Sequence, residues 1–273
     1  MSVVINTNSI ALGVQRNLAS ATTDLSKRMQ RLSSGLRINS ASDDAAGLAI
    51  STKLGVQVSA SDIARNNTQT GINMLQVAEA DLGQIANHLS RMRDLAVQSA
   101  NGVYSDTERD TLDAEYQSLV AEIGRITDSS AFAGINFFGT NATTVKLQVG
   151  TGNSDAKDTV SVTFNKASEI KGSLGNVSTA ALATTAIGTL DTQIKAISTY
   201  RANIGSNINR LSGTVTRLAA TKENMAAAKS TLMDADIAEE AAALTRAQIL
   251  QQTASTMLQQ ANQAPSVALM LVQ

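Results

Sequence analysis

The chain of 273 residues has no cysteine, a formal net charge of −1 and a charged content of only 16%. The lack of cysteine excludes disulfides, thiol catalysis and zinc–thiolate sites, and the lack of a basic block argues against a nucleic-acid partner. The hydrophobic residues are mostly Ala, Leu, Ile and Val rather than aromatic, which favours helices packed side by side. The first residues resemble no conventional signal peptide and no apolar run is long enough for a membrane span, so we expect neither.

An amphipathic helix is predicted from Ile10 to the glycine at position 35. Its apolar stripe has helical spacing and consists of Ile10, Val14, Leu18, Ala21, Leu25 and Leu32. After a turn, a new helix is predicted to start with Ser40 or Ser42 as its N-cap and with Asp43 and Asp44 in its first turn. A helix start explains this acidic pair better than a catalytic dyad does.

Two further helices share a spacing of three and four between apolar positions. The second helix is clearest at Leu75, Ala78, Leu82, Ile85, Leu89, Met92 and Ala96. It is expected to end at Asn101-Gly102, and Ser105 with Glu108 forms a predicted capping box for the third helix. The stripe of the third helix is Leu112, Tyr116, Leu119, Ile123 and Ile126. A shared period predicts that these helices pack together lengthwise.

The pattern changes between residues 129 and 185. TTVKLQVG and DTVSVTF alternate polar with β-branched or aromatic residues and are joined by a turn-rich stretch, which predicts a β-hairpin. The following segment, SEIKGSLGNVSTAALATTA, is small and polar, and we expect it to face solvent.

The longest predicted helix spans residues 187–232 and would be about 70 Å long. Its positions at alternating steps of three and four are Ile187, Leu190, Ile194, Ile197, Arg201, Ile204, Ile208, Leu211, Val215, Leu218, Lys222, Met225, Lys229 and Leu232. A seven-residue repeat of this length is typical of a helix that offers one narrow seam to other helices. The predicted fold is therefore mainly α, a rod-like coiled-coil bundle of long antiparallel helices with a small β-hairpin insertion.

A last amphipathic helix is predicted after residue 232. Its apolar positions are Ile237, Ala241, Leu244, Ile249, Met257 and Ala261, followed by a cluster at residues 269–272. The acidic residues Asp234, Asp236, Glu239 and Glu240 are interpreted as a helix start, since no histidine or glycine-turned calcium loop accompanies them. Both ends of the chain are weak amphipathic helices, so we expect them to become ordered on assembly.

No motif for catalysis, cofactor binding or metal binding is present, and the single histidine, His88, is interpreted as a surface residue. One helix face stands apart from the second stripe. Arg91, Leu95 and Gln98 lie on it at helical spacing. Leu95 is either a partly covered surface residue or a contact for a partner.

The sequence resembles bacterial flagellin, the subunit of the flagellar filament. The motifs that carry the resemblance occupy both ends of the chain in the family's order and cover roughly residues 1–140 and 185–273. They are INTNSIAL, RLSSGLRINSASDDAAGLAIS, TGINMLQVAEADL, LSRMRDLAVQSANG and RAQILQQTASTMLQQANQAPSVALML.

The resemblance implies a division into five segments. Terminal helices at 1–44 and 233–273 would pair into a filament core. Residues 45–128 and 186–232 would form a helical rod, and residues 129–185 a short variable region with the hairpin. The implied protein is a non-enzymatic, secreted subunit without cofactors that self-assembles helically into the extracellular filament for motility.

The resemblance also implies partners. These are other copies of the chain, the hook-associated junction and cap proteins, the flagellar type III export apparatus and an export chaperone. We expect assembly and the chaperone to use Ile10, Val14, Leu18, Leu25, Leu250, Met257, Leu258, Leu269 and Leu271. In flagellins that the host Toll-like receptor recognises, the contact face matches Arg91, Leu95 and Gln98 here, with Glu115 on the next helix. Asp94 and Ser90 depart from the residues common at their positions, which leaves the strength of recognition open.

Two alternatives stay open from the sequence. A hook–filament junction protein has similar ends, and a coiled-coil partner module would not form filaments. A flagellin with a protease in its middle is disfavoured, because the insert is short and lacks HExxH.

Overall fold

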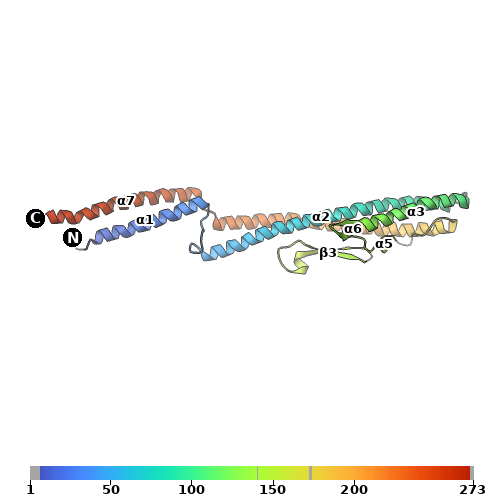
Figure 1. Ribbon diagram of the computed structural model, residues 1–273, viewed down its shortest axis with the longest axis horizontal. Helices are drawn as coiled ribbons and strands as arrows, with labels where there is room; N and C mark the ends of the chain where they lie inside the picture. The colour runs from blue at the N-terminus through green and yellow to red at the C-terminus, as the bar shows by residue number, and fades with distance from the viewer. Residues whose placement is uncertain (1–6, 140, 172–173, 271–273) are drawn as a thin grey trace. The chain divides into compact units, whose positions relative to one another are not determined.

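A computed structural model describes most of the chain, namely residues 7–139, 141–171 and 174–270 without the side chains of residues 167–168 and 264–270. The long helices in Figure 1 are α1 (Ser9–Ser34), α2 (Ala45–Ala100), α3 (Asp106–Ser129), α6 (Ala180–Met233) and α7 (Ile237–Met270). The short elements are β1 (Ala131–Phe132), β2 (Ile135–Asn136), β3 (Thr143–Gln148), α4 (Asp155–Asp158), β4 (Thr159–Phe164) and α5 (Ala167–Lys171). The prediction of a mainly helical fold with a small hairpin is confirmed, and the short antiparallel pair of β1 with β2 was not predicted.

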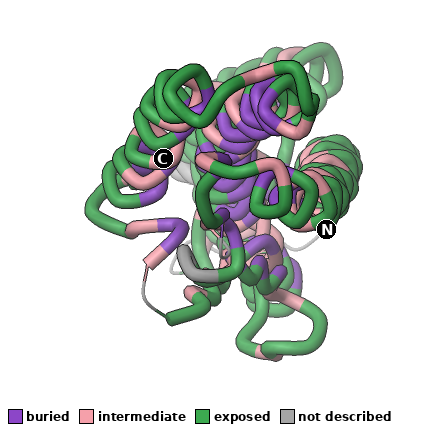
Figure 2. The backbone as a smooth tube through the Cα atoms, turned by 90° about the vertical axis from the view of Figure 1, so that its right-hand side faces the viewer, coloured by how far each residue is buried: buried purple, intermediate pink, exposed green. Residues whose placement is uncertain are grey.

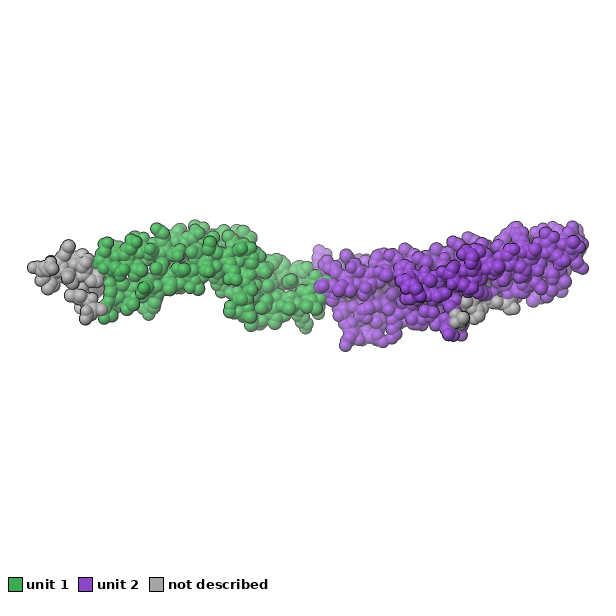
Figure 3. Space-filling model, viewed as in Figure 1, with its two compact units in different colours: residues 1–58, 224–273 green, residues 59–223 purple. Residues whose placement is uncertain are grey.

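The chain divides into two compact units, coloured in Figure 3. Unit 1 contains residues 1–58 and 224–273, and unit 2 contains residues 59–223. The unit boundaries fall inside α2 and α6. None of the helices in the described ranges is both long enough and apolar enough to cross a membrane.

The core of unit 2 is a heptad seam between long helices, as predicted. The stripe of α2 from Leu75 to Ala96 is buried, and Figure 2 shows such buried residues on the inner faces of the helices. On α6, buried large apolar residues recur every seven positions, at Leu190, Ile197, Ile204, Leu211 and Leu218. The alternate positions, such as Ile194 and Ile208, are half-buried. Knobs of one helix therefore fit between side chains of the other along the seam.

Three ion pairs join α2 to α6 beside this seam. Asp62 Oδ2 lies 2.8 Å from Lys222 Nζ, Glu79 Oε1 lies 2.6 Å from Arg201 Nη2, and Asp191 Oδ1 lies 2.6 Å from Arg93 Nε. Residue numbers rise on α2 as they fall on α6, so the two helices are antiparallel. Two of the three charged residues that interrupt the predicted stripe of α6 are thereby explained as ion-pair partners at the edge of the core.

The seam extends further along α2 than its large apolar residues suggested. Its earlier buried positions hold small residues: Ser61, Ala64, Thr68 and Gly71. Thr68 donates its hydroxyl proton to the Ala64 carbonyl at 2.7 Å, which satisfies this buried polar group within the helix. A Cβ atom at Gly71 would lie 2.5 Å from Cδ1 of Leu147 on β3, so glycine leaves room for the hairpin. Small residues thus let another element approach α2 closely.

The predicted hairpin is formed by β3 and β4. The strands are antiparallel, with Val145 opposite Val162 in a register that runs from Thr143–Phe164 to Gln148–Thr159. One face of β4 is buried through Val160, Val162 and Phe164, and these side chains belong to the same core as the helices. The hairpin therefore packs on the helices through one face and leaves its other face open.

The expectation that the segment after the hairpin faces solvent is only partly right: residues such as Asn176 and Thr179 are exposed, but several apolar side chains of the segment are not. Ile170, Leu174 and Val177 are buried in the core of unit 2, and α6 already begins at Ala180. The Tyr116 and Ser99 hydroxyls donate to the carbonyl oxygens of Leu174 and Val177, respectively. Few apolar residues suffice here because buried side chains of α2 and α3 satisfy the backbone polar groups of the segment.

Candidate functional site: the paired terminal helices

Unit 1 is organised by the antiparallel pairing of α1 with α7. Asn8 Nδ2 donates to the Ala261 carbonyl oxygen at 2.7 Å near one end of the pair, and Arg28 contacts Glu240 near the other. Among the described apolar side chains of these two helices, the buried ones are Ala21, Ala247 and Ala261. The pair therefore leaves most of its larger apolar side chains uncovered.

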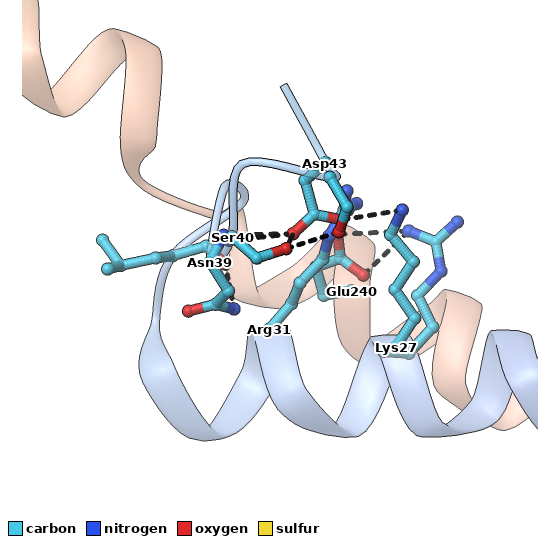
Figure 4. A network of polar contacts seen from close by, with 9 residues as sticks. Lys27, Arg31, Asn39, Ser40, Asp43 and Glu240 are labelled. Atoms are coloured by element: carbon cyan, nitrogen blue, oxygen red, sulfur yellow. Dashed lines mark hydrogen bonds and ion pairs between the residues drawn. The ribbon is translucent and has the colours of Figure 1, made fainter. Parts of the chain in front are cut away.

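A buried carboxylate joins the two helices. Glu240 of α7 accepts hydrogen bonds from Arg28 Nη1 at 2.9 and 3.1 Å and from Arg31 Nη1 at 3.1 Å, in the network of Figure 4. Burial of Glu240 opposes its ionisation, but the hydrogen bonds from Arg28 and Arg31 together hold the pKa of this carboxyl below its usual value. The cluster fixes the register of α1 against α7.

A second carboxylate closes the loop between α1 and α2. Asp43 accepts the backbone N–H groups of Asn39 and Ser40, both at 3.2 Å, and pairs with Lys27 Nζ of α1 at 2.9 Å (Figure 4). The hydrogen bond from Lys27, followed by that from the Asn39 backbone, lowers the pKa of Asp43 to about 2. The two acidic residues after residue 42 thus have structural roles, as predicted, but the roles differ: Asp43 binds the loop, and Asp44 contacts the start of α2.

The predicted N-cap of α2 is wrong by a few residues. Asp44 Oδ1 accepts the backbone N–H of Gly47 at 2.8 Å, so Asp44 caps a helix that starts at Ala45. Ser40 and Ser42 instead share a hydrogen bond at 2.7 Å between their hydroxyls. With Asp43 folded back onto the loop, the next carboxylate along the chain is the one placed to cap the helix.

The acidic residues at the start of α7 also divide their tasks. Asp236 Oδ1 accepts the backbone N–H groups of Ala238 at 2.8 Å and of Glu239 at 3.2 Å, which makes Asp236 the cap. Within the described residues, no group of three or more His, Cys, Asp or Glu side chains is arranged to hold a metal ion.

The ion cluster around Glu240 was not predicted. The sequence features that could have indicated it are Arg28 and Arg31, two positive charges about one turn apart on α1.

An apolar groove of about 760 Å³ runs between α1 and α7. Its apolar lining consists of Ile10, Val14, Ala21, Leu250, Ala254, Met257 and Ala261, among a few polar residues. Ile10, Leu250 and Met257 are exposed.

Of the residues predicted for the terminal surface, Ile10, Val14, Leu250 and Met257 thus meet in one groove. Leu18, Leu25 and Leu258 are half-buried on the same two helices. The Leu269 side chain and Leu271 lie outside the described residues.

The predicted Arg91 face lies in unit 2 and differs from expectation at its centre. Leu95 is only 1% exposed, because α3 as well as α6 packs on α2 and the buried surface of α2 is wider than one stripe. Leu95 is therefore a core residue and not a partly covered one. Arg91 stays exposed and pairs with Glu115 at 2.7 Å, and the exposed Gln98 donates to the Tyr104 hydroxyl at 3.1 Å.

Comparison with known proteins gives consistent results over both ends of the chain. Two family models match: the bacterial flagellin N-terminal helical region over residues 5–143 and the bacterial flagellin C-terminal helical region over residues 187–272. A flagellin of Halalkalibacterium halodurans is 40% identical, over 99% of this chain and 100% of that protein. A flagellar filament 33 kDa core protein of Treponema phagedenis is 38% identical, with the same coverage of both chains. The crystal structure of Bacillus cereus flagellin, 37% identical, matches with a TM-score of 0.52 over 60% of this chain and 94% of that one.

Long helices packed on a heptad seam and a terminal pair with uncovered apolar side chains define a helical structural protein. The sequence relationships specify which one: the chain belongs to the bacterial flagellin family. It is a structural subunit of the flagellar filament and not an enzyme. The family match does not favour the hook–filament junction protein or the partner module.

Proposed function

We propose that the subunit polymerises through the groove between α1 and α7, with apolar side chains of a second copy as its occupant. The observation that carries this proposal is that Ile10, Leu250 and Met257 are exposed side by side on a helix pair whose buried apolar contacts are alanines. Contiguous exposed apolar surface of this kind marks an interaction site. A contact of different surfaces on successive copies repeats without closing, which produces an open fibre.

The test is growth from filament seeds, followed by negative-stain microscopy. Leu250→Asp puts a charge into the groove, where it would be buried without a partner, so growth is expected to stop. Because Leu250 is exposed in the monomer, the variant should fold normally. The matched control is Leu182→Asp at an exposed position of α6 in unit 2, which should grow like the unmodified chain. Long filaments of Leu250→Asp would contradict the proposal.

We further infer that the subunit is secreted through the flagellar type III apparatus and that an export chaperone first covers its C-terminal apolar residues. Leu250 and Met257, both exposed, and the half-buried Leu258 support this inference. Leu269 and Leu271 complete the proposed surface. Family membership supports contacts of the finished filament with hook-associated proteins. Loss of chaperone binding in Leu258→Asp, measured by calorimetry, is the expected result, and unchanged affinity would contradict it.

A second proposed role is recognition of the free subunit by the host Toll-like receptor for flagellin. Its support is the exposed patch of Arg91, Gln98 and Glu115 on neighbouring helices. Because Leu95 is buried, we propose that it supports this patch from below instead of touching the receptor. In a receptor reporter assay, Arg91→Ala should reduce the response without unfolding unit 2. An unchanged response would exclude this role for Arg91.

A further inference from the structure

The methionines whose side chains the structure describes fall into two groups by burial. Met74, Met92 and Met233 are buried, and Met225 is half-buried. In contrast, Met29 on α1 is 55% exposed and Met257 on α7 is 53% exposed. Within the described side chains, the exposed thioethers therefore lie on the two terminal helices.

The two exposed methionines differ in their surroundings. Met257 lines the groove between α1 and α7, where Leu250, Ala254 and Ile10 are among its apolar neighbours. Met29 is not part of the groove lining. The chain thus offers two methionines of almost equal exposure, one inside the proposed polymerisation surface and one outside it.

We propose that Met257 is an oxidation site at which a peroxide stops polymerisation of the free subunit. The inference rests on the assembly groove proposed above. In the reaction, a sulfur lone pair of the thioether attacks one oxygen of hydrogen peroxide, the O–O bond breaks and the S–O bond of the sulfoxide forms. The sulfur loses two electrons, the peroxide gains them, and with proton transfer water leaves.

The sulfoxide changes what the groove can accept. Thioether sulfur is apolar and adaptable, whereas the sulfoxide oxygen is a strong hydrogen-bond acceptor. A second copy that covers Met257 with apolar side chains would leave this oxygen without a donor, which disfavours the contact. In the filament the same coverage shields Met257 from peroxide, so the free subunit is the sensitive species.

The experiment treats the full-length monomer with hydrogen peroxide and follows two quantities over time. Peptide mapping by mass spectrometry gives the oxidised fraction of each methionine, including Met1 and Met270. Aliquots freed of peroxide are added to filament seeds to measure the growth rate. Met29 and Met257 are expected to oxidise at least ten-fold faster than Met74 and Met92.

The growth rate is expected to fall at least ten-fold in step with oxidation of Met257 and to recover with methionine sulfoxide reductases. Two matched variants decide which thioether matters. Leucine has similar size and no oxidisable sulfur, so the growth rate of peroxide-treated Met257→Leu or Met29→Leu is compared with the untreated rate of the same variant. After peroxide, Met257→Leu should keep its growth rate, and Met29→Leu should lose it as the unmodified chain does.

Three results would overturn the proposal. They are normal growth of subunits oxidised at Met257, loss of growth in peroxide-treated Met257→Leu, and equal oxidation rates of Met257 and the buried Met92. Failure of the assembly proposal itself is distinguishable, because it appears as normal growth of untreated Leu250→Asp.

Discussion

The hydroxyl of Tyr116 gives the most specific test of how unit 2 is held together. The side chain is fully buried in α3, and its hydroxyl donates to the Leu174 carbonyl oxygen, which anchors the segment before α6. Tyr116→Phe keeps the ring and leaves the carbonyl without this donor, a change that costs about 2 kcal/mol. With an m-value of about 2 kcal/mol per molar urea, the unfolding midpoint should fall by about 1 M. Circular dichroism follows unfolding, and hydrogen exchange at residues 174–177 locates the effect.

The control substitution is Tyr104→Phe. Tyr104 is half-buried and accepts its hydrogen bond from the exposed Gln98, so water replaces the lost contact and the midpoint should hardly change. A shift of less than about 0.3 M for Tyr116→Phe, or an equal shift for both variants, would refute the anchoring role.

The same tyrosine predicts a pH dependence. Burial, with a smaller contribution from Asp113, raises the pKa of Tyr116 from 10.0 to about 12. Between these values the unfolded chain has released the phenol proton while the folded chain retains it, so stability falls as pH rises. The advantage of the unmodified chain over Tyr116→Phe should shrink by about 1.4 kcal/mol per pH unit above pH 10. An advantage that stays constant up to pH 11.5 would contradict this reasoning.

The remaining predictions concern assembly and the core. Leu258→Asp should block growth from seeds while hydrogen exchange of unit 2 stays unchanged; normal filaments or an unfolded unit 2 would refute it. Glu240→Gln should lower the temperature at which filaments dissociate, because Arg28 and Arg31 lose their counter-charge. In the unmodified chain this contribution is present above the ordinary pKa of 4.5 and is lost as pH falls below it. Leu95→Ala should cost about 2–5 kcal/mol in urea unfolding, whereas a cost below about 0.5 kcal/mol would mean that Leu95 is exposed.

The long helices and the hairpin were predictable because their apolar residues recur at regular spacings. Leucine and isoleucine at steps of three and four identify a helix seam regardless of its partner, and β-branched alternation identifies a strand. The part of the seam before Leu75 could not be predicted from the sequence. Its positions hold Ser61, Ala64, Thr68 and Gly71, which are buried because they are small and not because they are strongly hydrophobic. For Gly71 the reason becomes apparent only once its neighbour, Leu147 of the hairpin, is known.

The sequence pattern also did not show that a third helix would bury part of α2. The stripe of α2 predicts one packing face, yet α3 adds a second face that covers Leu95. Likewise, Leu174 and Val177 look isolated among small polar residues, because their anchors, Tyr116 and Ser99, are distant in sequence. Four residues of the predicted terminal surface do line one groove, since helix periodicity places them on one face of each terminal helix.

A heptad seam alone does not determine the alignment of its two helices. If one helix slides by seven residues, large apolar residues again lie beside large apolar residues. The three ion pairs between α2 and α6 favour one of these alignments. After such a slide, Arg201 would lie beside Ala86 or Ile72 instead of Glu79. Arg93 would lie beside Ser198 or Thr184 instead of Asp191, whereas Asp62 would meet another lysine, Lys229, in one of the two directions. Each exposed pair adds only about 0.5 kcal/mol to stability, but together they distinguish one alignment from its equally apolar neighbours. The apolar residues hold the two helices together, and the ion pairs determine their alignment along the seam.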